Sequence, residues 1–267
     1  MKSLVIAEKP SVARDIARVL KCNKNISGAI EGNQYIVTWA LGHLVTLADP
    51  EGYDKKFKEW NMQVLPMMPK KMELVVIKKT AKQYNAVKAQ MFRKDVGEII
   101  IATDAGREGE LIFKHVYDLS GSKKPVKRLW ISSLEDSAIL DGMQHLRSAE
   151  EYRHLAEAAV CRSQADWLVG MNATRAYTTK YFKKLTVGRV QTPTLAMLVE
   201  RAGQISNFQK EKYFNVELDC DGIPAVKPKI FDPDEAEQLR SRCQGSEAIV
   251  TAVKETEKKV KAPKLYD

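Results

Sequence analysis

Short apolar runs alternate with stretches of helical spacing through the first half of the chain, and this alternation limits the fold more than any other feature. The apolar runs are of the kind that fills strands buried on both faces of a sheet, and they lie at residues 4–7, 35–39, 73–77, 99–102 and 129–131. Apolar residues recur at helical spacing at 12–20, 82–93 and 108–117. Strands that alternate with helices predict a mainly parallel sheet flanked by helices, and therefore an α/β fold.

The second half of the chain changes character twice. Residues 149–205 contain helix formers and few strand signals, whereas residues 213–218 alternate with period two and residues 248–253 are a further strand candidate. These changes predict three domains, which are an α/β domain at 1–148, a helical domain at 149–210 and the incomplete start of a β-rich domain at 211–267.

The charge balance favours a polyanionic partner. The 267 residues include 43 Lys and Arg against 34 Asp and Glu, a formal net charge of +9, which suits nucleic acid. We find no apolar run of membrane-spanning length and no signal peptide, so we expect no membrane contact. The four cysteines form no CxxC pair, which argues against a zinc ribbon and favours a reducing cytoplasm.

The sharpest local feature is an acidic turn at residues 102–110, between a predicted buried strand and a predicted helix. It carries Asp104, Glu108 and Glu110, and Glu8 ends the first strand. Carboxylates at strand ends suit a hard divalent cation, which can bridge to phosphate. They are equally compatible with capping a helix N-terminus. The sequence contains neither a GxGxxG turn nor a Walker-type phosphate loop.

Several segments in this order resemble the type IA DNA topoisomerases, most closely the bacterial topoisomerase III branch. Residues 6–11 with 104–110 resemble the metal-binding Toprim domain of that family, so the resemblance implies a Toprim-type sheet followed by a helical domain and the start of an arch domain. The other matching segments are residues 37–44, 127–133, 170–176 and 188–195.

The resemblance implies a Mg²⁺ site with Glu8, Asp104 and Glu108 as ligands, and Glu8 and Lys9 as catalytic residues. Lys9 would neutralise the scissile phosphate. Many relatives carry a second Asp where this chain has Gly106. A missing carboxylate favours one ion held mainly by Glu8 and Asp104, with Glu108 as an auxiliary or water-mediated ligand.

The resemblance also implies a single-stranded DNA surface. Arg162 and Asp166 are four residues apart and share a helix face, so Asp166 could orient Arg162, or the two could form an ordinary surface ion pair. Tryptophan can stack on bases but is more often buried. The residues expected to contact DNA are Trp60, Arg162, Asp166, Trp167, Arg175, Gly188, Arg189, Val190, Gln191, Thr192 and Pro193.

The family cuts one DNA strand with a tyrosine hydroxyl, forms a 5′-phosphotyrosine, passes a strand through the gap and reseals it without ATP. None of the nine tyrosines lies in the family's tyrosine motif, and Tyr266 lies in a segment that resembles the hinge before the tyrosine domain. We therefore expect an amino-terminal fragment that binds metal and DNA without cleaving. We expect it in the bacterial cytoplasm, associated with the nucleoid or a plasmid.

Two other functions stay open at this point. A Toprim nuclease or primase-like enzyme would share Glu8 and Asp104 but would not need residues 188–195. A non-enzymatic DNA-binding truncation would act through binding alone, and metal would then be dispensable.

Overall fold

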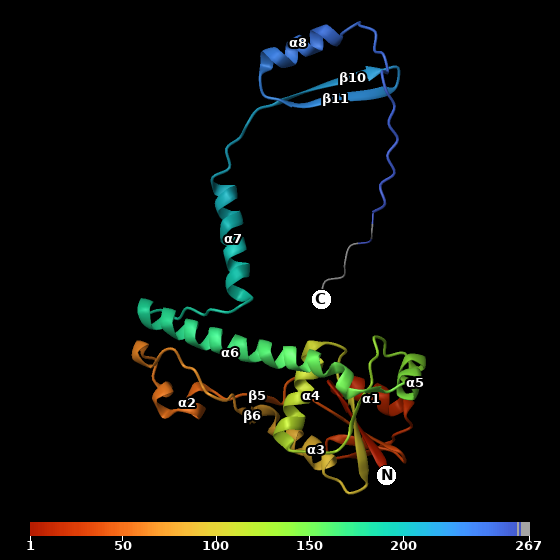
Figure 1. Ribbon diagram of the computed structural model, residues 1–267, viewed down its shortest axis with the longest axis vertical. Helices are drawn as coiled ribbons and strands as arrows, with labels where there is room; N and C mark the ends of the chain where they lie inside the picture. Colours follow the sequence, from red (N-terminus) through yellow and green to blue (C-terminus); the bar gives the residue numbers. More distant parts are fainter. Residues whose placement is uncertain (261, 263–267) are drawn as a thin grey trace. The chain divides into compact units, whose positions relative to one another are not determined.

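A seven-stranded sheet forms the centre of the first of two structural units (Figure 1). The computed structural model describes residues 1–260 and 262, and its units are Met1–Met197 and Leu198–Asp267. The strand order is β2-β3-β4-β1-β7-β8-β9, and the central strands β4, β1, β7 and β8 pair in parallel. The predicted α/β fold is confirmed. The strands of this sheet are β1 (Lys2–Ala7), β2 (Lys24–Ile26), β3 (Ala29–Glu31), β4 (Tyr35–Trp39), β7 (Val96–Ala102), β8 (Val126–Arg128) and β9 (Arg147–Ser148).

Helices cover both faces of the sheet because its central strands are apolar on both sides. On one face, alternate residues of β1 and β7 pack against Tyr84, Val87 and Ile112. On the other face, the intervening residues pack against Ile16 and Ile139. The helices on the first face are α3 (Ala81–Met91) and α4 (Arg107–Ser120), and the short 3-10 helix η3 (Lys78–Thr80) precedes α3. The helices on the second face are α1 (Pro10–Val19) and α5 (Asp136–Gln144).

Two of the predicted strands are wrong. Residues 129–131 follow strand β8 instead of forming it. They are apolar because Leu129 packs in the core beside α5 and Trp130 stacks on Tyr152, with ring centroids 4.4 Å apart. Residues 248–253 form no strand in the described part of the chain, where they pair with none of the strands and are exposed to solvent.

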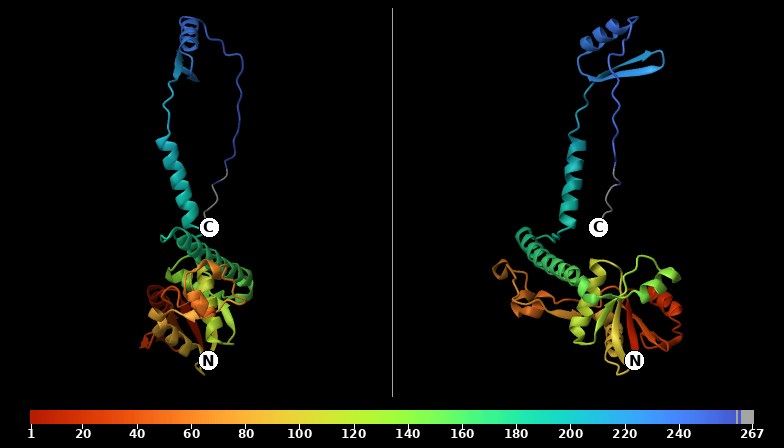
Figure 2. Two further views of the ribbon diagram at one scale, coloured as in Figure 1. Left: turned by 90° about the vertical axis from the view of Figure 1, so that its left-hand side faces the viewer. Right: turned by 45° about the vertical axis from the view of Figure 1, so that its right-hand side comes forward.

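Residues 48–73 form a segment that we call the arm, which lies alongside the long helix α6 (Arg153–Tyr181) (Figures 1 and 2). The strands β5 (Val45–Leu47) and β6 (Leu74–Val76) pair at its base. Phe57 and Met67 of the arm pack against Trp167 of α6. The arm has little regular structure, and its short helices are α2 (Pro50–Tyr53), η1 (Lys55–Lys58) and η2 (Met62–Val64).

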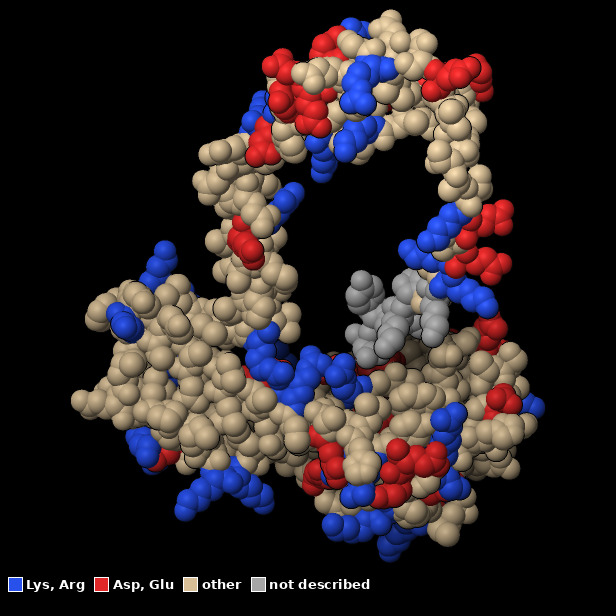
Figure 3. Space-filling view, turned by 45° about the horizontal axis from the view of Figure 1, so that its top comes forward, with Lys and Arg blue, Asp and Glu red and all other residues tan. Residues whose placement is uncertain are grey.

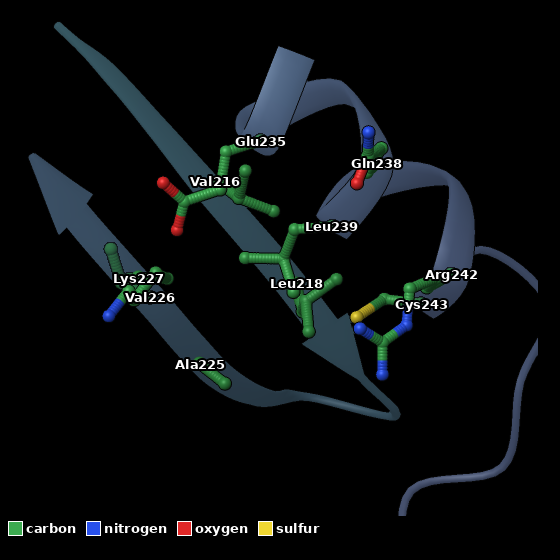
Figure 4. A pocket seen from close by; sticks show the side chains of 10 residues that line it. All are labelled: Val216, Leu218, Ala225, Val226, Lys227, Glu235, Gln238, Leu239, Arg242 and Cys243. Carbon is green, nitrogen blue, oxygen red and sulfur yellow. The ribbon is translucent and has the colours of Figure 1, made fainter. Parts of the chain in front are cut away.

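In its described residues, the second unit contains the end of α7 (Gln191–Ser206), a hairpin and one further helix. Strands β10 (Phe214–Cys220) and β11 (Ile223–Ile230) are antiparallel, and helix α8 (Pro233–Cys243) packs on them. Figure 4 shows Leu239 of α8 facing Leu218 of β10 across a pocket of about 410 Å³. The small core beneath it contains Val216, Ile230 and Ala236, so this unit has a limited apolar interior.

Helix α7 (Gln191–Ser206) crosses the boundary between the units, and the short helix η4 (Ala149–Tyr152) precedes α6. The division into three domains at residues 148 and 210 stays a prediction. The hinge-like segment around Tyr266 lies outside the described residues. Within residues 1–260 and 262, no helix combines the length and the apolar character that a membrane crossing requires.

Candidate metal and nucleic-acid site

The carboxyl ends of β1 and β7 bring two acidic residues together. The strands are neighbours, and Ala7 lies opposite Ala102, so Glu8 and the turn after residue 102 leave the sheet at the same edge. The Glu8 side chain is largely buried, and its Oε2 accepts a hydrogen bond from the backbone N–H of Asp104 at 3.2 Å. The topology of a parallel sheet therefore assembles this pair from residues 96 positions apart.

The ammonium group of Lys9 lies between the two carboxylates. Its Nζ is 3.3 Å from Asp104 Oδ2 and 3.8 Å from Glu8 Oε1. The hydrogen bond to Asp104, followed by the charges of Asp104 and Glu8, raises the pKa of Lys9, so the lysine is a cation at neutral pH. Lys9 also precedes Pro10, the first residue of α1, where proline's fixed φ suits a helix start.

The acidic turn folds back closely on itself. A Cβ on Gly109 would lie 2.1 Å from the backbone oxygen of Asp104, so only glycine fits at that position. Thr103 Oγ1 donates to the carbonyl of Gly109 at 2.9 Å and closes the turn. Gly106 differs, because a Cβ there would meet nothing within 4 Å. Packing does not exclude a carboxylate at position 106, and this chain simply carries none.

Glu108 faces His43 and Arg162 rather than the other two acids. Its Oε2 lies 3.4 Å from His43 Nε2, and its Oε1 lies 3.3 Å from Arg162 Nη1 on α6. Asp166 follows one turn later on α6, and its two oxygens lie 3.8 Å from Arg162 Nε and 3.0 Å from Arg189 Nη1. The result is a row of alternating charges from the acidic turn across α6 to the segment before α7.

A pocket of about 310 Å³ lies beside this row. His115 of α4 lines it and is almost wholly buried, and burial lowers the pKa of His115, which favours the neutral ring. Its Nδ1 has no hydrogen-bond partner among the described residues. The other lining residues are His43, Val45, Thr46, Glu108, Leu111, Ala159, Arg162, Ser163 and Asp166.

Two of the expected DNA-binding residues are buried and hold the arm, while a third stays exposed. Trp167 is 7% exposed, and its indole N–H donates to the carbonyl of Ala48 at 2.9 Å. Arg175 is 5% exposed and donates to the carbonyl of Phe57. The Trp60 ring lies 5.2 Å from the Arg175 guanidinium carbon but remains 46% exposed. Trp60 therefore presents an aromatic face to solvent and Trp167 does not.

The turn before α7 caps that helix. The Gly188 N–H donates to Thr192 Oγ1 at 3.1 Å, and the Thr192 N–H donates back to the Gly188 carbonyl at 3.2 Å. Val190 is 71% exposed, and Gln191 and Pro193 are also exposed. Of this segment, the structure brings only Arg189 into the row of charges.

The donor set fits Mg²⁺. In the described part of the chain, no cluster of three or more His, Cys, Asp or Glu side chains is arranged to hold a metal. Glu8 and Asp104 nevertheless both reach one cation, the Lys9 ammonium. Mg²⁺ in proteins is commonly held by one or two carboxylates with waters and substrate phosphate completing its shell, so a two-carboxylate site suits it.

Sequence reasoning missed a buried arginine at this edge. Arg128, the last residue of β8, is fully buried and donates to Glu110 Oε1 at 2.7 Å. The sequence offers one signal for it, a charged residue directly before the apolar run at 129–131. That signal is weak, since an arginine at the end of a strand is usually exposed.

Comparisons with known proteins agree with the fold. A family model described as the Toprim domain matches residues 3–134, and one described as DNA topoisomerase matches residues 150–267. The chain is 53% identical to DNA topoisomerase 3 of Bacillus subtilis and 51% identical to that of Bacillus licheniformis, in each case over its whole length. It spans 38% of the length of each of these relatives.

A solved structure shares the fold. Full-length topoisomerase I from Thermotoga maritima superimposes with a TM-score of 0.60 at 22% identity, over 89% of this chain and 37% of that one. The fold and the family match at residues 3–134 define a protein with a Toprim domain. With both domains matched, the chain belongs to the type IA DNA topoisomerases and is homologous to the amino-terminal part of DNA topoisomerase 3.

Proposed function

We propose that this chain forms the metal- and DNA-binding part of a type IA topoisomerase that cuts, passes and reseals single DNA strands. The observation that carries the proposal is the meeting of Glu8, Lys9 and Asp104 at the carboxyl edge of the parallel sheet. Ligands gather at that edge in open α/β sheets. Two carboxylates and one ammonium suit a site that holds both a metal and a phosphate.

Glu8 and Asp104 are the proposed direct ligands of Mg²⁺, which when bound would orient the cut DNA ends for resealing. The Asp104 N–H holds Oε2 of Glu8. The other oxygen, Oε1, lies 3.8 Å from Lys9 Nζ and is the one proposed to bind the metal or to donate a proton to the leaving 3′-oxygen. Lys9 neutralises the charge that builds up on the scissile phosphate. Contacts with Arg162 and His43 support an auxiliary role for Glu108.

Single-stranded DNA is the proposed partner, and the row from Glu108 to Arg189 is the proposed start of its path. Asp166 holds Arg162 and Arg189, and arginine's planar fork suits phosphate. The exposed ring of Trp60 is a stacking surface for a base. For Trp167 and Arg175 we propose an indirect role, which is to hold the arm that carries Trp60. Residues 188–193 would contribute backbone and Thr192 hydroxyl contacts to phosphate.

The lysine-rich stretch at residues 55–82 supports the same partner. Residues 55–82 contain eight Lys and only two acidic residues, and all eight lysines are exposed. In Figure 3, basic side chains project on the side where Figure 1 labels α2, with few acidic ones beside them. We propose that these lysines follow the backbone of bound DNA, in a protein that acts on bacterial DNA in the cytoplasm.

The first test uses the 267-residue chain and a fluorescent single-stranded oligonucleotide. We expect the oligonucleotide to bind, and the logarithm of the binding constant to fall linearly with the logarithm of the salt concentration, because Lys and Arg displace counterions. After Mg²⁺ incubation and denaturant trapping we expect no covalent adduct, since none of the nine tyrosines lies in the family's tyrosine motif. Absence of binding at low salt would contradict the proposed partner, and a recovered adduct would show that a tyrosine of this chain attacks DNA.

The second test measures metal binding directly, with Mn²⁺ as a paramagnetic substitute for Mg²⁺. Glu8→Gln and Asp104→Asn should each weaken Mn²⁺ binding strongly, because each removes one of two charged ligands. Glu108→Gln should weaken it only slightly. Equal losses in all three variants would make Glu108 a direct ligand, and no loss in any of them would refute the proposed metal site. Mn²⁺-dependent cleavage that leaves free DNA ends would favour a nuclease.

A further inference from the structure

Arg128 occupies the space beyond the end of the β-ladder, next to the acidic turn. Strand β8 ends at this residue, and its neighbour β7 ends at Ala102. The backbone carbonyls of Thr103 and Asp104 therefore have no partner strand on that side. The Arg128 guanidinium supplies the missing donors, with Nη1 2.8 Å from the Thr103 oxygen and Nη2 2.9 Å from the Asp104 oxygen.

The same side chain is held from its other sides. Nη1 also donates to the carbonyls of Ile101 at 3.2 Å and Leu129 at 2.8 Å. Nε donates to Glu110 Oε1 at 2.7 Å, and the Trp130 ring centroid lies 4.9 Å from the guanidinium carbon. A buried cation is tolerable only when its donors are satisfied and its charge is paired. This one meets both conditions, so its position is closely defined.

Glu110 is the third carboxylate of the turn, but it is 3% exposed and faces Arg128 rather than Glu8. Burial raises the pKa of Glu110 and lowers the pKa of Arg128, because desolvation outweighs the attraction within the pair. The pair joins the first turn of α4 to the end of β8. Arg128 thus holds the turn of residues 103–109 on both sides. It bonds to the carbonyls of Thr103 and Asp104 just after β7, and to Glu110 at the start of α4.

We propose that Arg128, anchored by Glu110, is a positioning residue for the metal site. It fixes the backbone of Thr103 and Asp104, so that the Asp104 N–H reaches Glu8 and the Asp104 carboxylate shares a cation with Glu8. The inference rests on the proposed function in so far as that cation is the catalytic metal. The geometry of the turn itself is independent of that assignment.

The experiment compares Arg128→Lys with the unmodified 267-residue chain. Lysine keeps the positive charge for Glu110 but has a single nitrogen that cannot reach four carbonyls at once. We expect amides of residues 103–109 to exchange hydrogen at least ~10-fold faster, with the exchange of β1 and α1 unchanged. We also expect Mn²⁺ affinity to fall by about 10- to 100-fold, as when the supporting partners of metal ligands are lost.

Arg18→Lys is the matched control. Arg18 also donates two hydrogen bonds to a carboxylate, that of Asp136, but on the exposed surface between α1 and α5. Its variant should leave both the exchange of residues 103–109 and Mn²⁺ affinity unchanged. If Arg128→Lys does not fold, Glu110→Gln is the milder variant, since an amide oxygen still accepts from Nε while the charge pairing is lost, and the same two effects are expected.

Each outcome decides one question. Faster exchange with weaker Mn²⁺ binding supports the positioning role. Faster exchange with unchanged affinity means that Arg128 stabilises only the fold, and unchanged exchange means that it does not hold the turn, so either result overturns the inference. If the unmodified chain binds no Mn²⁺, the proposed metal site fails, and the exchange of residues 103–109 still decides whether Arg128 holds the turn.

Discussion

The two tryptophans near α6 show how much a residue's environment decides its role. The sequence predicted DNA contact for both Trp60 and Trp167. In the structure Trp167 packs against Tyr53, with ring centroids 5.4 Å apart, and its N–H is bonded to a backbone carbonyl. Trp60 is 46% exposed. The residue type alone could not separate them, because tryptophan is amphipathic and suits both settings.

We therefore predict opposite effects for the two alanine variants. Trp60→Ala should weaken single-stranded DNA binding by ~1–3 kcal/mol, the usual value of one stacked base, and leave the free energy of unfolding nearly unchanged. Trp167→Ala should lower the free energy of unfolding by about 3–5 kcal/mol through loss of buried volume. Fluorescence anisotropy and urea unfolding measure the two effects. An unstable Trp60→Ala variant with normal DNA binding would contradict the assignment.

At the scale of elements, α6 is the support for the arm. Its side chains satisfy backbone groups of a segment that has little secondary structure of its own. The amide of Asn172 accepts from the Met67 N–H at 2.6 Å and donates to the Met67 carbonyl at 3.0 Å. Trp167 and Arg175 donate in the same way to the carbonyls of Ala48 and Phe57. Helix formers at residues 149–205 predicted a helical region here, but polar residues that bond to a distant segment follow no pattern in the sequence.

Removing one of these supports should loosen the arm. Asn172→Ala leaves both backbone groups of Met67 without a partner, and we predict a loss of roughly 1–3 kcal/mol in the free energy of unfolding. Asn85→Ala, at an exposed position of α3, is the control and should have almost no effect. Urea unfolding followed by circular dichroism makes the comparison. Equal stability of the two variants would mean that the Met67 hydrogen bonds are not required.

At the scale of the whole molecule, charge is distributed unevenly. The net charge is +9, and residues 55–82 alone contribute an excess of six lysines over acids. Exposed lysines that outnumber the acidic residues around them repel each other, so a polyanion that binds them lowers this repulsion. Composition predicted a polyanionic partner, but the exposure of this charge on and beside the arm depends on the fold.

The salt dependence of DNA binding should show whether the exposed lysines of residues 55–82 contact DNA. Replacing Lys70 and Lys71 with Gln should reduce the slope of log affinity against log salt by about 1.4, because each phosphate of a single strand that is no longer neutralised accounts for about 0.7. Replacing Lys94 and Lys123 with Gln removes the same amount of charge elsewhere. Lys94 lies just before β7 and Lys123 just after α4, at the edge of the sheet opposite to the one that carries Glu8 and Asp104. This control should leave the slope nearly unchanged. Equal reductions would indicate binding by net charge alone.

Local sequence was sufficient for the central elements. The apolar runs predicted β1, β4 and β7, because a strand buried on both faces must be apolar throughout. The predicted helices likewise match α1, α3 and α4 within a few residues. The hairpin of β2 and β3, strand β11 and helix α8 were missed, since they are short or largely polar and carry no clear apolar run or helical spacing.

The sequence by itself determined the α/β sheet, the acidic turn after β7 and the family, because each depends on residue order along a short stretch or on several stretches in sequence. Only the tertiary structure decided which partner each of the four acidic residues has. Glu8 and Asp104 meet around Lys9, Glu108 turns to Arg162, and Glu110 is buried against Arg128. A carboxylate's role depends on the charge that the fold places opposite it, and those partners come from residues far away in the sequence.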